Sequence, residues 1–410
     1  MTSQIRHHRI ASTMAIALLL CALPVQANQL SRSTHKALNE ARDLMDKDKH
    51  DAALAELNEL LDKIGEREYE KALTLQSLGY AYIGTDEDRQ AIDAFERALE
   101  LDALPDSPRV RLQNMLARLY ARTEQYAKAY DYLRDWFAEI EKPAADDYAL
   151  KANILVQLER NKEGIRAIRK AIEMSDRPRE QYYQILVSLQ FAAERYAEAA
   201  KTLEDILGNW PQKARYWRQL ASVYLNLERN EDAHAVLKLA YRKGLLEEGD
   251  EIVRLARLGL SIDVPAGAAE LMEKEIERGR VKANEDHWEL TGHAWARAKE
   301  WNKASAAYAN AAEYGHAGKY HMRRARMFTY QNDWQGAIEA ASLALEDDDL
   351  DSPGGAHILI GRGHLELGQH EQAMAAFEAA QNYGDSADQA RQWRQYAKRQ
   401  KQYNGARNTS

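Results

Sequence analysis

Cysteine, proline and phenylalanine are scarce in this sequence of 410 residues, which holds one, eight and five of them respectively. A single cysteine excludes an intramolecular disulfide and a thiolate metal site. Alanine, leucine, glutamate, arginine and tyrosine are plentiful instead, a balance that is typical of helical arrays. The composition therefore favours an all-α fold.

Motifs of catalysis and metal binding are missing as well. The sequence has no glycine-rich phosphate loop and no G-x-S-x-G motif. Residues 347–351 have the aspartate spacing of a calcium loop, but Ser352 replaces the turn glycine and Ile358 the bidentate glutamate. Two histidine pairs, at 287/293 and 364/370, lie six residues apart, whereas a helical zinc pair lies four apart. We predict that the protein is not an enzyme and holds no metal and no cofactor.

The first 27 residues have the features of an export signal. Arg6 and Arg9 precede an apolar run over residues 10–23, and this segment contains no acidic residue. Pro24 ends the run, and residues 25–27 place small side chains at −3 and −1. This pattern predicts a Sec-type signal peptide that is cleaved between Ala27 and Asn28.

Two other interpretations of this segment fit less well. The apolar run is too short to span a bilayer comfortably, and Leu20 stands before Cys21 where a lipoprotein signal needs glycine or alanine. Cleavage would leave a chain without cysteine, which suits an oxidising compartment. The formal charge would fall from −8 to −10 because Arg6 and Arg9 leave with the signal. An acidic, exported chain is a poor candidate for nucleic-acid binding.

The residues from Ala72 to Pro105 form a unit on which the rest of the chain is patterned. Counted from Ala72, this unit has key residues at positions 7, 8, 11, 20, 24, 27 and 34, namely Leu78, Gly79, Tyr82, Ala91, Phe95, Ala98 and Pro105. The spacing resembles the tetratricopeptide repeat, in which two antiparallel helices meet at small residues beside an aromatic side chain.

The same pattern recurs along the chain. Position 8 is glycine or alanine in nine of ten units, which hold Ala41, Gly79, Ala117, Ala152, Val187, Ala221, Ala256, Gly292, Ala325 and Gly361. Twelve residues later all ten are glycine or alanine: Ala53, Ala91, Ala129, Gly164, Ala199, Ala233, Ala268, Ala304, Ala337 and Ala373. This recurrence predicts a right-handed superhelical solenoid of about ten helix–turn–helix repeats.

The recurrence also predicts the organisation of the chain. A polar lead at 28–33 precedes ten repeats at 34–387, and a helix at 388–403, rich in arginine, lysine and glutamine, should cap the last repeat. Residues 404–410 are expected to be frayed. The fourth and seventh repeats depart most from the pattern, and the segment 346–355 suggests a flexible joint.

The resemblance implies that first-helix positions 2, 5 and 9 line a concave groove. These positions hold nine basic residues, namely Arg42, Arg111, Arg118, Arg215, Arg218, Arg257, Lys319, Arg326 and Arg362. Four acidic residues accompany them: Asp146, Asp250, Asp286 and Glu289. The five excess positive charges suggest a basic trough for an acidic segment or a carboxylate, because arginine pairs bidentately with carboxylates.

The residues expected to bind a partner are Arg42, Arg118, Arg218, Arg257, Arg326 and Arg362. The alternative is that these arginines pair with carboxylates on adjacent repeats and only hold the array together. Trp136, Trp217 and Trp288 are interpreted as core residues rather than ligand platforms.

The whole chain also resembles the exported tetratricopeptide proteins that accompany TonB–ExbB–ExbD energy-transduction systems in Gram-negative bacteria. The stretches that carry this resemblance are L-S-R-S-T-H-K-A-L-N-E-A-R-D-L-M, A-L-E-L-D-A-L-P-D, W-P-Q-K-A-R-Y-W-R-Q-L-A-S-V-Y-L and L-K-L-A-Y-R-K-G-L-L. It implies a periplasmic scaffold that supports uptake of iron chelates by outer-membrane transporters, with TonB-, ExbB- or ExbD-type partners. The alternative is a periplasmic scaffold or enzyme regulator in polysaccharide export or cell-wall assembly.

Overall fold

The protein folds into helices joined by short turns. The computed structural model describes residues 30–348 and 350–407, so the predicted signal peptide and its cleavage site at Ala27 and Asn28 lie outside the described residues. Twenty-one helices follow one another, and the described residues form no strand. The predicted all-α fold is confirmed. Every helix in the described ranges is too short or too polar to cross a membrane.

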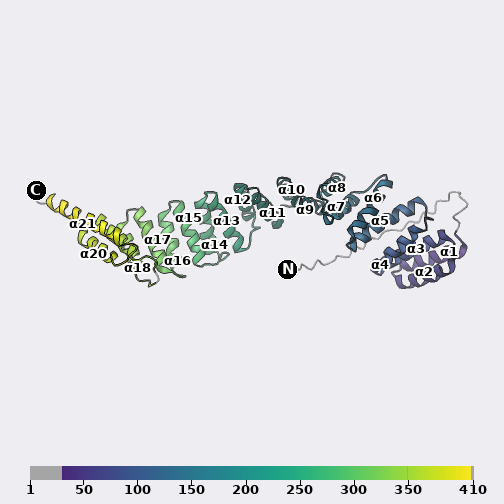
Figure 1. Ribbon diagram of the computed structural model, residues 1–410, viewed down its shortest axis with the longest axis horizontal. Coiled ribbons are helices and arrows are strands. Elements are labelled where there is room, and N and C mark those ends of the chain that lie inside the picture. The colour runs from purple at the N-terminus through teal and green to yellow at the C-terminus, as the bar shows by residue number, and fades with distance from the viewer. Residues whose placement is uncertain (1–29, 349, 408–410) are drawn as a thin grey trace. The chain divides into compact units, whose positions relative to one another are not determined.

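The helices fall into two compact units, which are described separately (Figure 1). The N-terminal unit comprises the described residues up to Met174. Its helices are α1 (Arg32–Asp46), α2 (His50–Ile64), α3 (Glu68–Gly84), α4 (Asp88–Glu100), α5 (Asp106–Arg122), α6 (Tyr126–Glu139), α7 (Ala145–Gln157) and α8 (Asn161–Glu173).

The C-terminal unit comprises the described residues from Ser175 onward. Its first seven helices are α9 (Glu180–Ala192), α10 (Tyr196–Asn209), α11 (Ala214–Asn226), α12 (Asn230–Arg242), α13 (Gly249–Ser261), α14 (Pro265–Glu277) and α15 (Glu285–Arg297). The others are α16 (Trp301–Ala312), α17 (Ala317–Tyr330), α18 (Trp334–Ala344), α19 (Pro353–Glu366), α20 (His370–Ala380) and α21 (Ala387–Arg407).

Each odd-numbered helix up to α19 packs against the even-numbered helix that follows it, which makes ten helix pairs. In Figure 1, α13, α15 and α17 follow one another along one side of the C-terminal unit and α14, α16 and α18 along the other. This arrangement matches the predicted helix–turn–helix repeats, and the right-handed superhelix stays a prediction.

Small residues stand where the two helices of a pair meet, as the sequence predicts. Ala53, Ala91 and Ala233 are fully buried. A Cβ atom added to Gly79 would lie 2.3 Å from the ring of Phe95. Gly292 with Tyr308 and Gly361 with Phe377 repeat this contact. Glycine is therefore required at position 8 in these repeats, because an aromatic ring lies directly on the helix backbone.

The turn inside each helix pair has one fixed backbone conformation. The fifteenth residue of every repeat has a positive φ, for example 59° at Asp86, a conformation that non-glycine residues adopt at a cost. These ten residues are Asp48, Asp86, Glu124, Glu159, Glu194, Glu228, Asp263, Lys299, Asn332 and Gly368. The left-handed residue lets the chain reverse within three residues, so the second helix folds back on the first.

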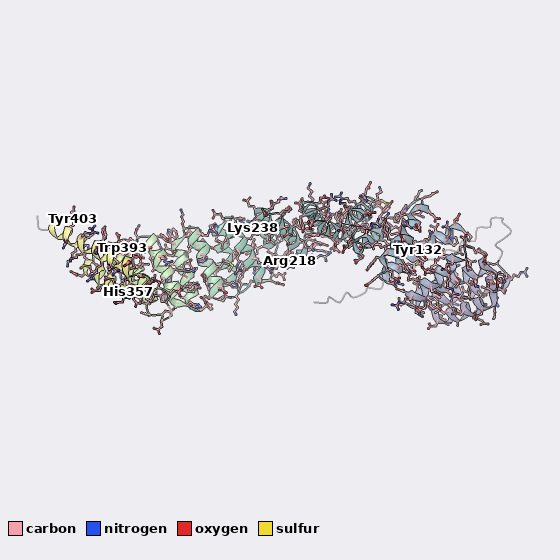
Figure 2. The ribbon with its side chains drawn as sticks, in the orientation of Figure 1. Tyr132, Arg218, Lys238, His357, Trp393 and Tyr403 are labelled. Atoms are coloured by element: carbon pink, nitrogen blue, oxygen red, sulfur yellow. The ribbon has the colours of Figure 1, made fainter. Side chains whose placement is uncertain are left out.

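The last helix, α21, covers the end of the C-terminal unit. It packs against α19 and α20 through Ala390 and Ala397, which are fully buried, and through Trp393, whose ring stacks 6.0 Å from that of Phe377. Figure 2 labels Trp393 on this helix, together with Tyr403, which is exposed. A polar helix over the final repeat is the capping arrangement expected of a repeat array. The helix extends beyond the predicted 388–403 segment.

The seventh repeat departs from the sequence pattern because it buries a carboxylate. Glu275, at a position that is usually apolar, is fully buried on α14. Its oxygens accept hydrogen bonds from Arg280 Nε and from Tyr241 Oη, the latter at 2.6 Å. Burial opposes ionisation, but these hydrogen bonds outweigh it and lower the pKa of Glu275.

Candidate functional site: the first helices of the repeats

The first helices of successive repeats are joined by polar contacts within each unit. In the N-terminal unit, Glu70 on α3 accepts a hydrogen bond from the backbone nitrogen of Ser31 at 2.9 Å. In the C-terminal unit, Tyr216 on α11 donates to Glu180 on α9 at 2.5 Å, and Tyr320 on α17 donates to Glu289 on α15 at 2.6 Å. These contacts join α3 to the start of α1, α11 to α9 and α17 to α15.

Three of the predicted binding residues make ion pairs within the chain. Arg118 on α5 lies 2.7 Å from Asp147 on α7, and Arg218 on α11 donates from Nη2 to Glu251 on α13 at 3.1 Å. Arg42 lies 3.9 Å from Asp46, one turn along the same helix. Arg118 and Arg218 therefore join adjacent repeats, which is the structural alternative that the sequence left open.

The other three predicted residues lie in the C-terminal unit and have no carboxylate partner in the described part of the chain. Arg257 on α13 and Arg326 on α17 are exposed, and neither guanidinium has an ion pair or hydrogen bond there. Arg362 on α19 is also exposed and lies 5.3 Å from the ring centre of Trp393 on α21. The guanidinium groups of Arg257 and Arg326, and that of Arg362 beside the Trp393 ring, are therefore available to a ligand.

These three arginines share one repeat position with a histidine. Position 9 of the last four repeats holds Arg257, His293, Arg326 and Arg362, which we call the position-9 row. Burial and the positive charge of Arg323 lower the pKa of His293. This lowering disfavours the charged form of His293, so the permanent positive charges of the row are those of its three arginines.

A glutamate beside the row is strongly held by the chain itself. Glu289 lies 2.7 Å from Lys319 and 2.8 Å from Arg323, and it accepts the hydroxyl hydrogen of Tyr320. Burial opposes ionisation of Glu289, yet the hydrogen bonds from Lys319 and Tyr320 and the charge of Arg323 lower its pKa to about 2. Glu289 thus joins α15 to α17 and does not neutralise Arg257 or Arg326.

We expect the contribution of Glu289 to disappear in acid. Its folded-state pKa lies below the ordinary value of 4.5, so its stabilisation is complete above pH 4.5 and is lost as the pH falls toward 2. Thermal unfolding of wild type and Glu289→Gln should differ clearly at pH 7 and much less at pH 3. The control is Asp286→Asn, an exposed position on the same helix. A difference that stays constant with pH would contradict this role.

The other residues that the sequence singled out have structural roles in the described chain. Asp347 accepts a hydrogen bond from the backbone nitrogen of Gly318 at 2.6 Å and so caps α17, which ties part of the predicted flexible joint to its neighbour. Within residues 30–348 and 350–407, no three His, Cys, Asp or Glu side chains are grouped as metal ligands. Trp136 and Trp217 are buried in the core, as predicted, whereas Trp288 is half-buried and packs against it.

Sequence reasoning missed the tyrosine–glutamate contacts between adjacent repeats. Tyr216 and Tyr320 stand at position 3, and each hydroxyl lies within hydrogen-bond distance of the glutamate at position 1 of the preceding repeat, Glu180 and Glu285. The spacing of 36 and 35 residues in the sequence could have revealed these pairs.

Comparison with known proteins supports the repeat architecture. The tetratricopeptide repeat family matches residues 185–244 and, through a second family description, residues 72–103 and 148–177. Segments of both units therefore match the tetratricopeptide repeat. No curated protein is similar enough in sequence to match it.

Three solved structures illustrate the likeness. A tetratricopeptide repeat protein from Parabacteroides merdae is 16% identical, with a TM-score of 0.40 over 64% of this chain and 99% of the other. YrrB, described as having an unusual peptide-binding site, is 18% identical, with a TM-score of 0.37 over 44% and 89%. The TPR2AB domain of yeast Sti1 in complex with pHSP90 is 17% identical, with a TM-score of 0.30 over 62% and 98%.

Proposed function

We propose that the protein is a non-catalytic scaffold that binds an acidic segment of a protein partner on the first-helix face of its C-terminal unit. The observation that carries this proposal is the state of Arg257 and Arg326, which are exposed and without a carboxylate partner in the described chain. Nearby, Arg218, Lys319 and Arg323 are each paired with glutamate. An arginine that no intramolecular carboxylate engages keeps its planar donor face for a ligand.

The proposal places the protein in the periplasm as an accessory component of a TonB-type energy-transduction system. Support for export comes from the basic start, apolar run and small residues of positions 1–27. Support for the TonB-type role is the resemblance of the four stretches quoted above to the proteins that accompany such systems. The partners would then be TonB-, ExbB- or ExbD-type components that present an acidic segment to the position-9 row.

The test is crosslinking of the mature protein in the periplasm, followed by pull-down and identification of partners by mass spectrometry. Wild type is compared with the double variant Arg257→Glu, Arg326→Glu. We expect the partner to be lost from the double variant while its thermal unfolding is unchanged, since both side chains are exposed.

The matched control is Lys238→Glu, which reverses an exposed charge on the second helix α12 of the same unit. Figure 2 labels Lys238 and also Arg218, which lies on the first helix α11. This control should keep its partners. Equal recovery from the wild type and the double variant would overturn the binding role of the arginines. Recovery of polysaccharide-export or cell-wall components would replace the TonB-type assignment by the envelope-biogenesis alternative.

A further inference from the structure

A cavity of about 270 Å³ opens in the N-terminal unit between the second helices α2 and α4, with α3 as its floor. Leu75 and Leu78 on α3 are buried and form the floor, and Leu61 on α2 forms an apolar wall. Arg89 and Arg97 stand among the polar residues that line it. The cavity is smaller than the roughly 300–1,000 Å³ of typical small-molecule sites. Its size suits a single side chain.

The next repeat shows what fills the corresponding space. A shift of 38 residues relates Asn58, Tyr82 and Ala94, which line the cavity, to Glu96, Tyr120 and Tyr132. The same shift relates Ala53 to Ala91 and Ala91 to Ala129, so it is the register of these repeats. The space that is open beside Ala94 is therefore the space that the Tyr132 side chain takes one repeat later.

In the next repeat, contacts on the ring and on the hydroxyl hold the Tyr132 side chain in the corresponding space. The ring of Tyr132, labelled in Figure 2, stacks on that of Tyr120 with centres 5.6 Å apart and planes 14° apart. The hydroxyl of Tyr132 donates to Glu96 at 3.0 Å, and Tyr120 donates to the same carboxylate. In the cavity, Tyr82 corresponds to the stacking ring of Tyr120, and Asn58 corresponds to the polar group of Glu96.

We propose that this cavity binds an aromatic side chain of a protein partner, placed next to a carboxylate in the partner's chain. The aromatic ring takes the place that Tyr132 has in the neighbouring groove and stacks on Tyr82. The carboxylate pairs with Arg89, which is exposed and has no ion pair in the described residues. Arg97 is partly engaged, since it lies 3.3 Å from Asp93. This site lies in the other unit from the position-9 row and does not depend on the proposed function.

The probe is the peptide acetyl-Ser-Tyr-Asp-Ser-amide, titrated to millimolar concentration into the full chain. Binding is followed by methyl NMR of the leucines, with Leu61, Leu75 and Leu78 as reporters at the cavity. We expect saturable shifts of the methyl signals of these three leucines. Replacing tyrosine by alanine in the peptide should abolish the shifts, and replacing aspartate by lysine should weaken binding about tenfold, as expected for loss of a charge-assisted pair.

Two protein variants complete the test. Ala94→Tyr should place a ring of the chain itself in the cavity, raise the melting temperature and abolish peptide binding. If it unfolds the protein, Ala94→Tyr with Asn58→Glu supplies the carboxylate that Tyr132 has in Glu96. Arg89→Glu should weaken the acidic peptide about tenfold, whereas Arg166→Glu, an exposed control on α8, should not. The absence of shifts at the three leucines, or equal binding of the tyrosine and alanine peptides, would overturn the proposal.

Discussion

Glu275→Ala should lower the free energy of unfolding by about 3 kcal/mol, because it empties a fully buried site and removes the carboxylate that Tyr241, Arg278 and Arg280 donate to. Tyr241 and Arg280 would lose their acceptor on α14. Glu275→Gln keeps the shape and should cost less. The effect is measured by urea unfolding monitored by circular dichroism at pH 7.

The control for this experiment is Glu277→Ala, which removes an exposed carboxylate two residues away on the same helix. Its effect should stay within about 0.5 kcal/mol. An equally mild effect of Glu275→Ala would contradict this prediction. It would mean that α12 and α14 rearrange to fill the site and that the carboxylate does not stabilise the seventh repeat.

Gly79→Ala should destabilise the N-terminal unit, although alanine is the better helix former. The new methyl group would overlap the ring of Phe95 at 2.3 Å. Overpacking costs roughly 1–3 kcal/mol, and the helix-propensity gain of about 1 kcal/mol offsets only part of it. We expect a net loss of up to about 2 kcal/mol, read from a lower melting temperature.

The neighbouring repeat supplies the rescue. A shift of 38 residues takes Gly79 to Ala117 and Phe95 to Leu133, so the double variant Gly79→Ala, Phe95→Leu recreates a pair that the chain already uses. Adding Phe95→Leu should restore most of the stability lost in Gly79→Ala. Gly208→Ala on α10, where an added Cβ meets nothing within 4 Å, should be neutral or stabilising. Additive losses in the double variant would show that the ring and the glycine do not interact.

The fold was predictable because it depends on local and periodic features. The small residues at positions 8 and 20 mark where two backbones approach, and their recurrence is visible without knowing any contact. Gly79 and Phe95 lie sixteen residues apart within one repeat, so their packing follows from the register alone. The burial of Glu275 could not be predicted in the same way, because it depends on Tyr241, which belongs to the preceding repeat.

The candidate site was only partly predictable for the same reason. Position 9 locates Arg257 and Arg326 on the first-helix face, but the sequence does not show which arginine meets a carboxylate. Arg118 meets Asp147 and Arg218 meets Glu251 across 29 and 33 residues, and these contacts depend on the side-chain geometry of two repeats. The cavity beside Ala94 is harder still to predict, because alanine is common in this array. Ala94 indicates a cavity only when it is compared with Tyr132, the residue at the equivalent position of the next repeat.

The left-handed turn residues have a colloidal consequence. Seven of the ten are acidic, namely Asp48, Asp86, Glu124, Glu159, Glu194, Glu228 and Asp263, and all seven are exposed. Because the turn recurs at one position of every repeat, each unit presents carboxylates of like sign at its turns. Two molecules that approach turn to turn would repel each other at distances up to the Debye length, about 10 Å at 0.1 M salt. The repulsion between molecules in a concentrated solution should therefore weaken as ionic strength rises. Contacts between the turns of two molecules should form only when salt screens these charges.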